Sequence, residues 1–452
     1  MDIASKHKLK PLWDDFKYKP HQIIGVQWMI ERDDEGGGIV ADEMGLGKTI
    51  QMLALILNSI ISHTLIIAPL AVLEQWKSTA ESSSIRVFLL NNGTWVLKSP
   101  MFSNRTSIYI CSYETAQRNL RAICEMGFDR LICDEAHRLA NPKTLSFQIV
   151  DAIDVSKRWF LTATPIVNSI RDIKSLFKLL RVDDDDIYKS IPTYVLARSM
   201  DQLEDAPLPP IIHTHEIDFI SDEEAEFYRG IQSNILNQLK YGELNGLDKL
   251  ALLLRLRQLS IHPNVYIEMK RKKGVYLKPF EGASSKFQYI SYLLNTESHE
   301  KHKWIIFCHF HEEMLMLKEF IRTFEFVRHI GIYSGKLNID ERSSLLKQMK
   351  EEFVDEKTCD VLIIQLQSGG VGLNLQEFDR IVFSSPWWTQ SMMNQAVGRA
   401  VRIGQMKQVV VHHLHLNEEK TLNIDRIINE KAQIKGLLNK KIIAMANRNV
   451  GT

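Results

Sequence analysis

Short apolar runs alternate with helical patterns in two stretches of the chain. Each run is rich in Ile, Val, Leu or Phe without regular polar positions, which is typical of strands that helices cover on both faces. The alternation of such strands with helices predicts parallel α/β sheets. The strands expected in the first stretch are Gly38–Ala41, Thr64–Ala68, Ser107–Cys111, Arg130–Cys133 and Trp159–Thr162. Those expected in the second stretch are Trp304–Cys308, Val327–Ile332, Val361–Gln365, Arg380–Phe383 and Gln408–His413.

The pattern changes between these two stretches. An acidic run covers Asp183–Asp186, and the prolines of Leu208–Pro210 interrupt any regular element. Apolar positions then recur with helical spacing over Phe227–Leu259, after a capping box formed by Ser221 and Glu224. We therefore expect an α/β lobe at 1–170, a helical insertion and linker at 171–275, a second α/β lobe at 276–435 and a helical tail at 436–452.

Composition and charge narrow the class of protein only in part. The 452 residues are 45% hydrophobic and 25% charged, a globular balance with room for two or three domains. No apolar run approaches the roughly 20 residues that cross a bilayer, and the first residues lack the apolar core of a secretory signal. The net charge of +1 neither favours nor excludes nucleic acid, because phosphate contacts are local. The five cysteines form no CxxC pair, which argues against disulfides or a zinc finger and favours buried thiols in a reducing compartment.

The first lobe carries a nucleotide-binding motif that follows a strand and opens a helix. Glycines let backbone N–H groups approach phosphate, and the helix N-terminus adds favourable partial charge. We expect Lys48 to reach the β and γ phosphates of ATP and the Thr49 hydroxyl to hold Mg²⁺. Asp42 stands where such a loop usually has its first glycine. The expected nucleotide-binding loop is Asp42, Glu43, Met44, Gly45, Leu46, Gly47, Lys48 and Thr49.

A second motif ends a buried strand with two carboxylates, in the segment Phe128–His137. Asp134 is placed to hold the metal, directly or through water. Glu135 can orient and deprotonate the attacking water, since positioning supplies most of the catalysis in phosphoryl transfer. Together the two motifs predict hydrolysis of ATP with Mg²⁺.

These motifs, followed by Thr162-Ala163-Thr164-Pro165, resemble the motor motifs of helicase superfamily two. The residue sequences of Asp42–Thr49 (DEMGLGKT) and Asp134–His137 (DEAH) resemble those of the Swi/Snf family of chromatin-remodelling and repair translocases. The resemblance implies two RecA-like parallel-sheet lobes with an inserted helical segment. It also implies that Gln22, in a motif beginning Lys19-Pro20-His21, reads the adenine edge. Within the family, the chain most resembles the repair-type branch of helicase-like transcription factors. It lacks the RING cysteines that this branch normally carries between its lobes.

The second lobe completes the resemblance with the segment Gln395–Gln405, which we name the arginine segment. Two arginines three residues apart share one face of a helix. The family resemblance implies that Arg399 and Arg402 act as fingers on the γ-phosphate. It further implies that Gly370 and Gly372, in a motif that couples the nucleotide and DNA sites, lie at the nucleotide.

Contacts with the DNA backbone are implied by the same resemblance. Two departures from the family pattern are Gln367, where a basic residue is usual, and Ser385, where an aspartate is usual. The pair Trp387-Trp388 is either core or a DNA wedge, and the arginines of the segment Leu252–Pro263 either contact DNA or solvate a helix. The residues expected at DNA are Pro69, Gln75, Trp76, Tyr113, Thr115, Asn168, Ser334, Gly335, Lys336, Gln367 and Trp388.

Three functions remain in competition at this point. The first is an ATPase that tracks along double-stranded DNA as a monomer, without separating the strands, and displaces nucleosomes or other DNA-bound proteins. The second is a helicase that unwinds RNA or DNA, and the third is a degenerate motor that serves as a scaffold. The family-specific arginine segment favours the first, and the intact Lys48, Asp134, Glu135 and Arg402 argue against the third. We expect the protein in the nucleus, or in a cytoplasmic viral factory if it is viral.

Overall fold

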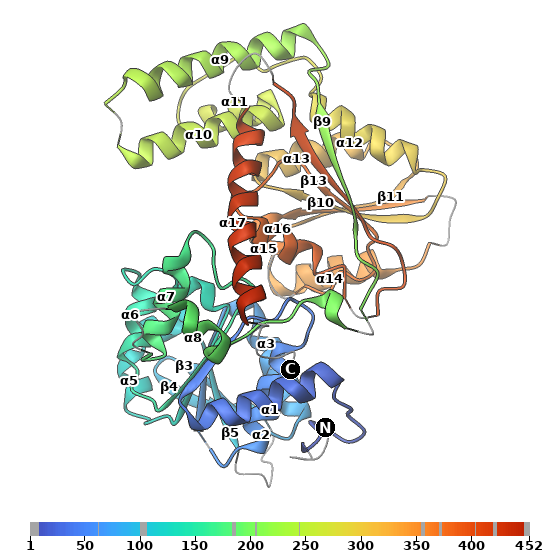
Figure 1. The fold of residues 1–452 in the computed structure, drawn as a ribbon. Helices are drawn as coiled ribbons and strands as arrows, with labels where there is room; N and C mark the ends of the chain where they lie inside the picture. Colours follow the sequence, from blue (N-terminus) through green and yellow to red (C-terminus); the bar gives the residue numbers. More distant parts are fainter. Residues whose placement is uncertain are drawn as a thin grey trace. The chain divides into compact units, whose positions relative to one another are not determined.

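The computed structural model describes residues 9–61, 63–99, 106–182, 187–203, 206–243, 245–353, 358–369, 373–402, 404–418 and 423–446. The chain divides into two compact units (Figure 1). Unit 1 comprises Met1–Ala206 together with Ile434–Thr452, and unit 2 comprises Pro207–Gln433. Each unit is built around one sheet, so the fold class predicted from the sequence, two parallel α/β lobes, is confirmed.

The sheet of unit 1 has eight strands in the order β4-β3-β5-β2-β6-β7-β1-β8. Neighbouring strands are parallel except for the antiparallel pair β3 and β4 at one edge. All five strands predicted for the first lobe are present. The strands are β1 (Gly37–Val40), β2 (His63–Ala68), β3 (Arg86–Asn91), β4 (Thr94–Leu97), β5 (Ser107–Ser112), β6 (Arg130–Asp134), β7 (Lys157–Leu161) and β8 (Val195–Leu196).

Helices connect these strands, and their apolar faces pack with the strands into a buried core. Because the strands β1, β2, β5, β6 and β7 run parallel, their carboxyl ends meet at one edge of the sheet. The segments that follow them therefore gather there, and these segments contain the sequence motifs. The helices are α1 (Pro20–Asp34), α2 (Lys48–Asn58), α3 (Leu73–Ser82), α4 (Tyr113–Arg118), α5 (Leu120–Cys124), α6 (Leu145–Ala152), α7 (Ile170–Leu179) and α8 (Ile187–Tyr194).

Unit 2 contains a six-stranded parallel sheet in the order β11-β12-β10-β13-β14-β9. Apolar side chains cover both faces, since Ile306 of β10 packs in one buried cluster and Ile305 in the other. All five strands predicted for the second lobe are present. The strands are β9 (Ile211–Ile217), β10 (His302–Cys308), β11 (Val327–Tyr333), β12 (Cys359–Gln365), β13 (Arg380–Phe383) and β14 (Val410–Leu416).

The helices of unit 2 include the pair predicted between the lobes. Ser221 caps α9, because its hydroxyl accepts a hydrogen bond from the Glu224 N–H at 3.1 Å. The helices are α9 (Asp222–Tyr241), α10 (Gly246–Ile261), α11 (Pro263–Arg271), α12 (Ser285–Thr296), α13 (His311–Ile321), α14 (Ile339–Lys350), α15 (Leu366–Gly369) and α16 (Gln390–Val397). In the described part of the chain, no helix has both the length and the apolar character needed to cross a bilayer.

The structure divides the chain differently from the predicted boundaries at 170, 275 and 435. The segment 171–275 is not a separate helical body, because β8 pairs with β1 in unit 1 and β9 pairs with β14 in unit 2. The sequence analysis did not predict β9, because the polar residues His213–Glu216 interrupt its apolar pattern. Such residues are compatible with the position of β9 at the edge of the sheet. The described part of the predicted tail, residues 436–446, is the end of α17 (Ile424–Ala446), whose Ile442 and Ala446 belong to the core of unit 1.

Candidate nucleotide-binding site

The loop between β1 and α2 has the backbone geometry of a phosphate-binding loop. Gly45 and Gly47 adopt φ values of 91° and 78°, and α2 begins directly afterwards at Lys48. The positive φ of Gly47 favours glycine, and a Cβ atom there would also lie 2.6 Å from Nε2 of Gln22. The Lys48 Nζ donates to the carbonyl oxygens of Asp42 at 2.6 Å and Glu43 at 3.2 Å, which places the ammonium inside the curve of the loop. Lys48 and Thr49 are both partly exposed at the start of the helix.

Asp42 does not present its carboxylate to a nucleotide, which corrects part of the prediction. Its side chain is fully buried and is paired with Arg198, whose Nε donates to Oδ1 at 3.0 Å. The Gln51 Nε2 donates to the other carboxylate oxygen at 3.0 Å. Only the backbone of Asp42 takes part in the loop, and Leu46 is likewise buried. The aspartate that replaces the first glycine is therefore an internal anchor of the loop.

Arg198 was missed by the sequence analysis, although it is bonded to two of the motifs. It follows β8 and also donates to the His21 carbonyl oxygen and, at 2.7 Å, to Oε1 of Gln51. Its own carbonyl oxygen accepts from the Glu43 N–H at 2.8 Å. The sequence carries no local signal for the pair, because Asp42 and Arg198 lie 156 positions apart.

Gln22, which the family resemblance places at the adenine edge, lies against this loop. Its Oε1 accepts from the Lys19 N–H at 3.0 Å, which fixes the carboxamide at the start of α1. The neighbouring His21 has its Nε2 at 3.0 Å from the Leu46 carbonyl oxygen. The first turn of α1 and the loop are thereby joined.

The two acidic residues of the second motif stand at the carboxyl end of β6. Glu135 adopts a left-handed backbone with φ 49°, which costs roughly 1–2 kcal/mol for a residue with a side chain and is typical of functional sites. The Asp134 carboxylate accepts from the Glu135 N–H at 2.9 Å through Oδ1 and from the Trp76 indole N–H at 2.8 Å through Oδ2. Burial raises the pKa of Asp134 to about 6, and the adjacent negative charge of Glu135 adds to the shift.

This donor set fits a hard divalent cation. Mg²⁺ prefers oxygen ligands, and two crowded carboxylates carry negative charge that such a cation offsets. Asp134 and Thr49 are the residues that would hold it. Within the described residues, no cluster of three or more His, Cys, Asp or Glu offers an alternative metal site.

Two residues predicted at DNA belong instead behind Asp134. Trp76 of α3 is fully buried, and Tyr113 at the start of α4 is 2% exposed. The Tyr113 hydroxyl donates to the backbone carbonyl oxygen of Asp134 at 2.8 Å. Their side chains are therefore not available to DNA, because the motifs that contain them turn these rings towards the core of unit 1.

The other DNA candidates of unit 1 divide by exposure. Gln75 and Asn168 are exposed and Thr115 is partly exposed, whereas Pro69 is buried. Asn168 accepts a hydrogen bond from Lys435 Nζ at 2.9 Å.

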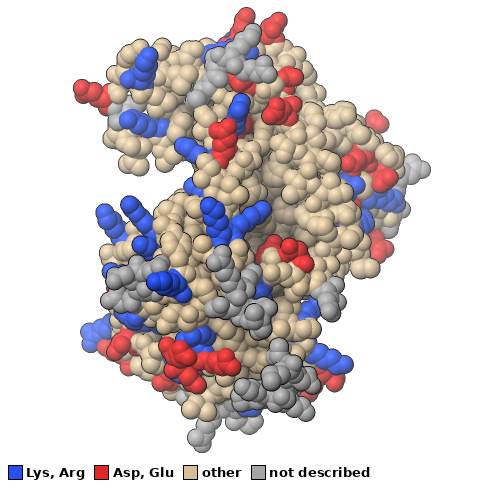
Figure 2. Space-filling model, in the orientation of Figure 1, with Lys and Arg blue, Asp and Glu red and all other residues tan. Residues whose placement is uncertain are grey.

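Figure 2 shows Lys and Arg side chains gathered on unit 1 around α6 and α7. Exposed basic residues in and near these helices are Arg138, Lys143, Arg171, Lys174 and Lys178.

The arginines of unit 2 do not share a helix face, which corrects the sequence prediction. α16 ends at Val397 with Gly398 as its cap, and Arg399 and Arg402 lie in the turns that follow. Arg399 is 5% exposed, and Arg402 is partly exposed with its Nε donating to the Gly398 carbonyl oxygen at 3.1 Å. Burial lowers the pKa of Arg402.

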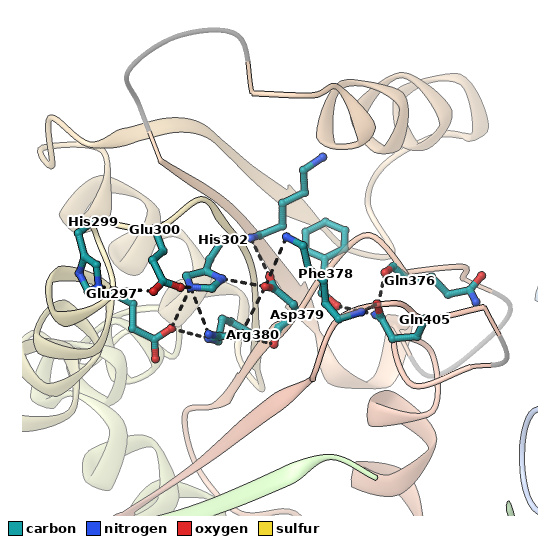
Figure 3. A network of polar contacts seen from close by, with 11 residues as sticks. Glu297, His299, Glu300, His302, Gln376, Phe378, Asp379, Arg380 and Gln405 are labelled. Atoms are coloured by element: carbon teal, nitrogen blue, oxygen red, sulfur yellow. Dashed lines mark hydrogen bonds and ion pairs between the residues drawn. The ribbon is translucent and has the colours of Figure 1, made fainter. Parts of the chain in front are cut away.

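Gln405 bonds the arginine segment to the loop that precedes β13. Its Nε2 donates to the carbonyl oxygens of Gln376 at 2.8 Å and Phe378 at 3.3 Å (Figure 3). The Leu375 N–H donates to the Arg399 carbonyl oxygen at 3.0 Å. Next in the chain, Asp379 is bonded to His302 at 2.7 Å. Burial raises the pKa of Asp379, but this bond and the nearby positive charges together lower it.

The remaining candidates of unit 2 have mixed outcomes. Gly335, Lys336 and Gln367 are exposed, whereas Ser334 is 3% exposed. Gly370 and Gly372 lie outside the described residues.

The tryptophan pair packs within unit 2. Trp387 is stacked on His309 with ring centroids 5.1 Å apart and is covered by the buried Arg257 at 4.6 Å. Trp388 packs against a cluster of buried apolar side chains from α9, α10 and α17, which favours core over wedge. Arg257 is 1% exposed and donates to the Pro386 carbonyl oxygen at 2.5 Å, so it neither reaches DNA nor solvates a helix. The Ser385 hydroxyl donates to the buried carboxylate of Asp425 at 3.1 Å.

Comparisons with known proteins agree with this arrangement. Residues 21–193 match the SNF2-related domain, and residues 285–404 match the helicase conserved C-terminal domain. A putative ATP-dependent helicase/translocase, YwqA of Bacillus subtilis, is 25% identical over 98% of this chain and 50% of its own length. A probable global transactivator of Orgyia pseudotsugata multicapsid polyhedrosis virus is 26% identical over 89% of this chain and 87% of its own length. The SWI2/SNF2 ATPase core of Sulfolobus solfataricus, solved with double-stranded DNA, is 22% identical over 96% of this chain and 98% of its own, with a TM-score of 0.41. The chain thus spans about half the length of the first of these relatives.

Proposed function

The chain belongs to the Snf2 family of ATP-dependent helicases, and we propose that it moves along double-stranded DNA without separating the strands. In this proposal the motor displaces or remodels proteins bound to the duplex, nucleosomes among them. It works as a monomer, in the nucleus or in a viral factory.

The observation that carries the ATPase part is the geometry at one edge of the unit 1 sheet. The loop that curves around the Lys48 ammonium, the start of α2 and the Asp134–Glu135 pair follow parallel strands of that sheet. Backbone N–H groups at a helix start and a lysine are complementary to phosphate, and an oxygen donor set is complementary to Mg²⁺. This arrangement suits hydrolysis of a nucleoside triphosphate.

Each side chain then has a role in the reaction. Lys48 neutralises charge on the β and γ phosphates, and Gln22 contacts the adenine. Glu135 accepts the proton of the attacking water and orients it in line with the γ-phosphorus. Thr49 and Asp134 would hold Mg²⁺, which would offset negative charge on the phosphate oxygens. Arg399 and Arg402 of unit 2 stabilise the charge that develops on the transferring group.

The dependence on DNA follows from the division of this machinery between two units. Lys48 and Glu135 belong to unit 1, and the two arginines belong to unit 2. Catalysis requires an arrangement of the units in which both sets reach one nucleotide, and DNA that binds both units stabilises that arrangement as a population shift. Exposed residues that carry over as DNA contacts are Gln75, Thr115, Asn168, Gly335, Lys336 and Gln367.

The experiment is a side-by-side measurement of ATP turnover without nucleic acid and with duplex DNA, single-stranded DNA or RNA. We expect duplex DNA to stimulate most. A triplex-displacement assay and a strand-displacement assay on the same preparation separate translocation from unwinding. Release of the third strand without separation of the duplex is expected, whereas ATP-dependent separation of the duplex would support the competing helicase function.

A further inference from the structure

Trp76 contacts the catalytic carboxylate from inside the protein. The ring is fully buried on α3, and its N–H lies 2.8 Å from Oδ2 of Asp134. The second oxygen, Oδ1, accepts from the Glu135 N–H at 2.9 Å. Each oxygen thus receives one N–H, and a carboxylate oxygen with two lone pairs can still bind a cation.

The backbone beneath this carboxylate is already fixed. Asp134 pairs with Leu161 of β7, and its carbonyl oxygen accepts from the Tyr113 hydroxyl at 2.8 Å. The remaining freedom of the residue is rotation of the side chain. The indole N–H comes from a different element and restricts that rotation. This arrangement is the one by which outer hydrogen bonds orient the ligands of metal sites.

We propose that Trp76 is a positioning residue that orients Asp134 for the divalent cation accompanying the nucleotide. This inference rests on the proposed nucleotide site. It assigns to the buried tryptophan of the segment Leu65–Trp76 a role in metal affinity and not in DNA contact. Outer hydrogen bonds of this kind are typically worth about 10–100-fold in metal affinity.

The chain contains a matched control for the loss of a buried indole hydrogen bond. Trp159 of β7 is also fully buried in unit 1, and its N–H donates to Oδ1 of Asp33 at 2.8 Å. Asp33 is paired with Arg130 and takes no part in the nucleotide site. Replacement of either tryptophan by phenylalanine removes the same donor and similar volume, so the two variants should lose comparable stability.

The test compares Trp76→Phe and Trp159→Phe with the unmodified chain. Binding of a fluorescent ATP analogue is measured in EDTA and then during a titration with Mg²⁺, together with the melting temperature. For Trp76→Phe we expect metal-free binding to be unchanged and the half-saturating Mg²⁺ concentration to rise about 10–100-fold. For Trp159→Phe we expect the Mg²⁺ titration of the unmodified chain. Equal titrations for all three proteins would overturn the proposal, and so would an equal shift in both variants.

A shape-preserving variant keeps the test decisive if phenylalanine disturbs folding. 3-Benzothienylalanine at position 76 replaces the indole N–H by sulfur at nearly constant volume, and the same residue at position 159 is its control. A raised Mg²⁺ requirement at position 76 alone supports the role of the N–H, and an unchanged one overturns it. Failure of the unmodified chain to bind the ATP analogue would instead refute the proposed nucleotide site.

Discussion

The nucleotide residues of unit 1 and the arginine segment of unit 2 are held in place by different means. In unit 1, Lys48 begins a helix, and Asp134 ends a strand with an N–H on each carboxylate oxygen. In unit 2, Arg399 and Arg402 lie in turns that follow the end of α16. Gln405, at the end of these turns, donates hydrogen bonds to two carbonyl oxygens of the loop before β13. Unit 1 therefore presents a prearranged binding site, whereas the position of the arginines depends on a few hydrogen bonds in irregular chain.

The two units also bury one aspartate each in a comparable way. Asp42 is paired with Arg198 beneath the nucleotide loop, and Asp425 is paired with Lys286 beneath the tryptophan pair. Both carboxylates are 0% exposed. The difference lies in what each anchors: the first holds the loop of the proposed nucleotide site, and the second joins α12, α10 and the end of β13 within unit 2.

The largest expected effect is that of Lys48→Ala. The lysine is partly exposed and donates to carbonyl oxygens of its own loop, so its removal should leave the melting temperature within a few degrees of the unmodified chain. ATP turnover should fall below detection, because in the proposed site Lys48 supplies the positive charge that offsets the β and γ phosphates. Ordinary turnover in a folded variant would show that the loop is not the nucleotide site.

The buried pairs sharpen the comparison through stability. Asp42→Asn and Asp425→Asn each leave a buried cation without its partner charge, which typically costs about 3–5 kcal/mol in the free energy of unfolding. Only Asp42→Asn should also weaken ATP binding, since Arg198 then ceases to hold the loop. Urea unfolding and titration with a fluorescent ATP analogue measure both effects. Equal losses of ATP affinity in the two variants would contradict the division of roles.

The smallest expected effect concerns the support of the arginines. Gln405→Ala removes hydrogen bonds worth about 0.5–1.5 kcal/mol each, so DNA-stimulated turnover should fall by up to about tenfold. Gln408→Ala is its control, because that side chain donates at 2.6 Å to the Pro209 carbonyl oxygen, away from the arginines. The role proposed for Gln405 would be contradicted if both variants kept full DNA-stimulated turnover, or if both lost the same fraction of it.

The sequence predicted those features that depend on local pattern. Ten apolar strands and the glycine loop were identified because burial on both faces and positive φ leave clear residue preferences. The orientation of Trp76 was not predictable, since a tryptophan beside the exposed Gln75 in a family motif looks the same whether it faces DNA or the core. The pairing of Asp42 with Arg198 joins positions 156 residues apart, which no local pattern reports. The end of α16 at Val397 was not predicted, because the helical spacing of residues in the sequence continues through Arg402.

The central claim is that residues of two units act on one nucleotide, and Arg402→Ala tests it most directly. ATP turnover is measured with saturating duplex DNA, and affinity for a fluorescent ATP analogue is measured on the same protein. We expect affinity close to that of the unmodified chain, because binding depends on unit 1, and a loss of about 10³–10⁵ in DNA-stimulated turnover. Normal turnover with DNA, or a loss of ATP binding in the folded variant, would contradict the claim.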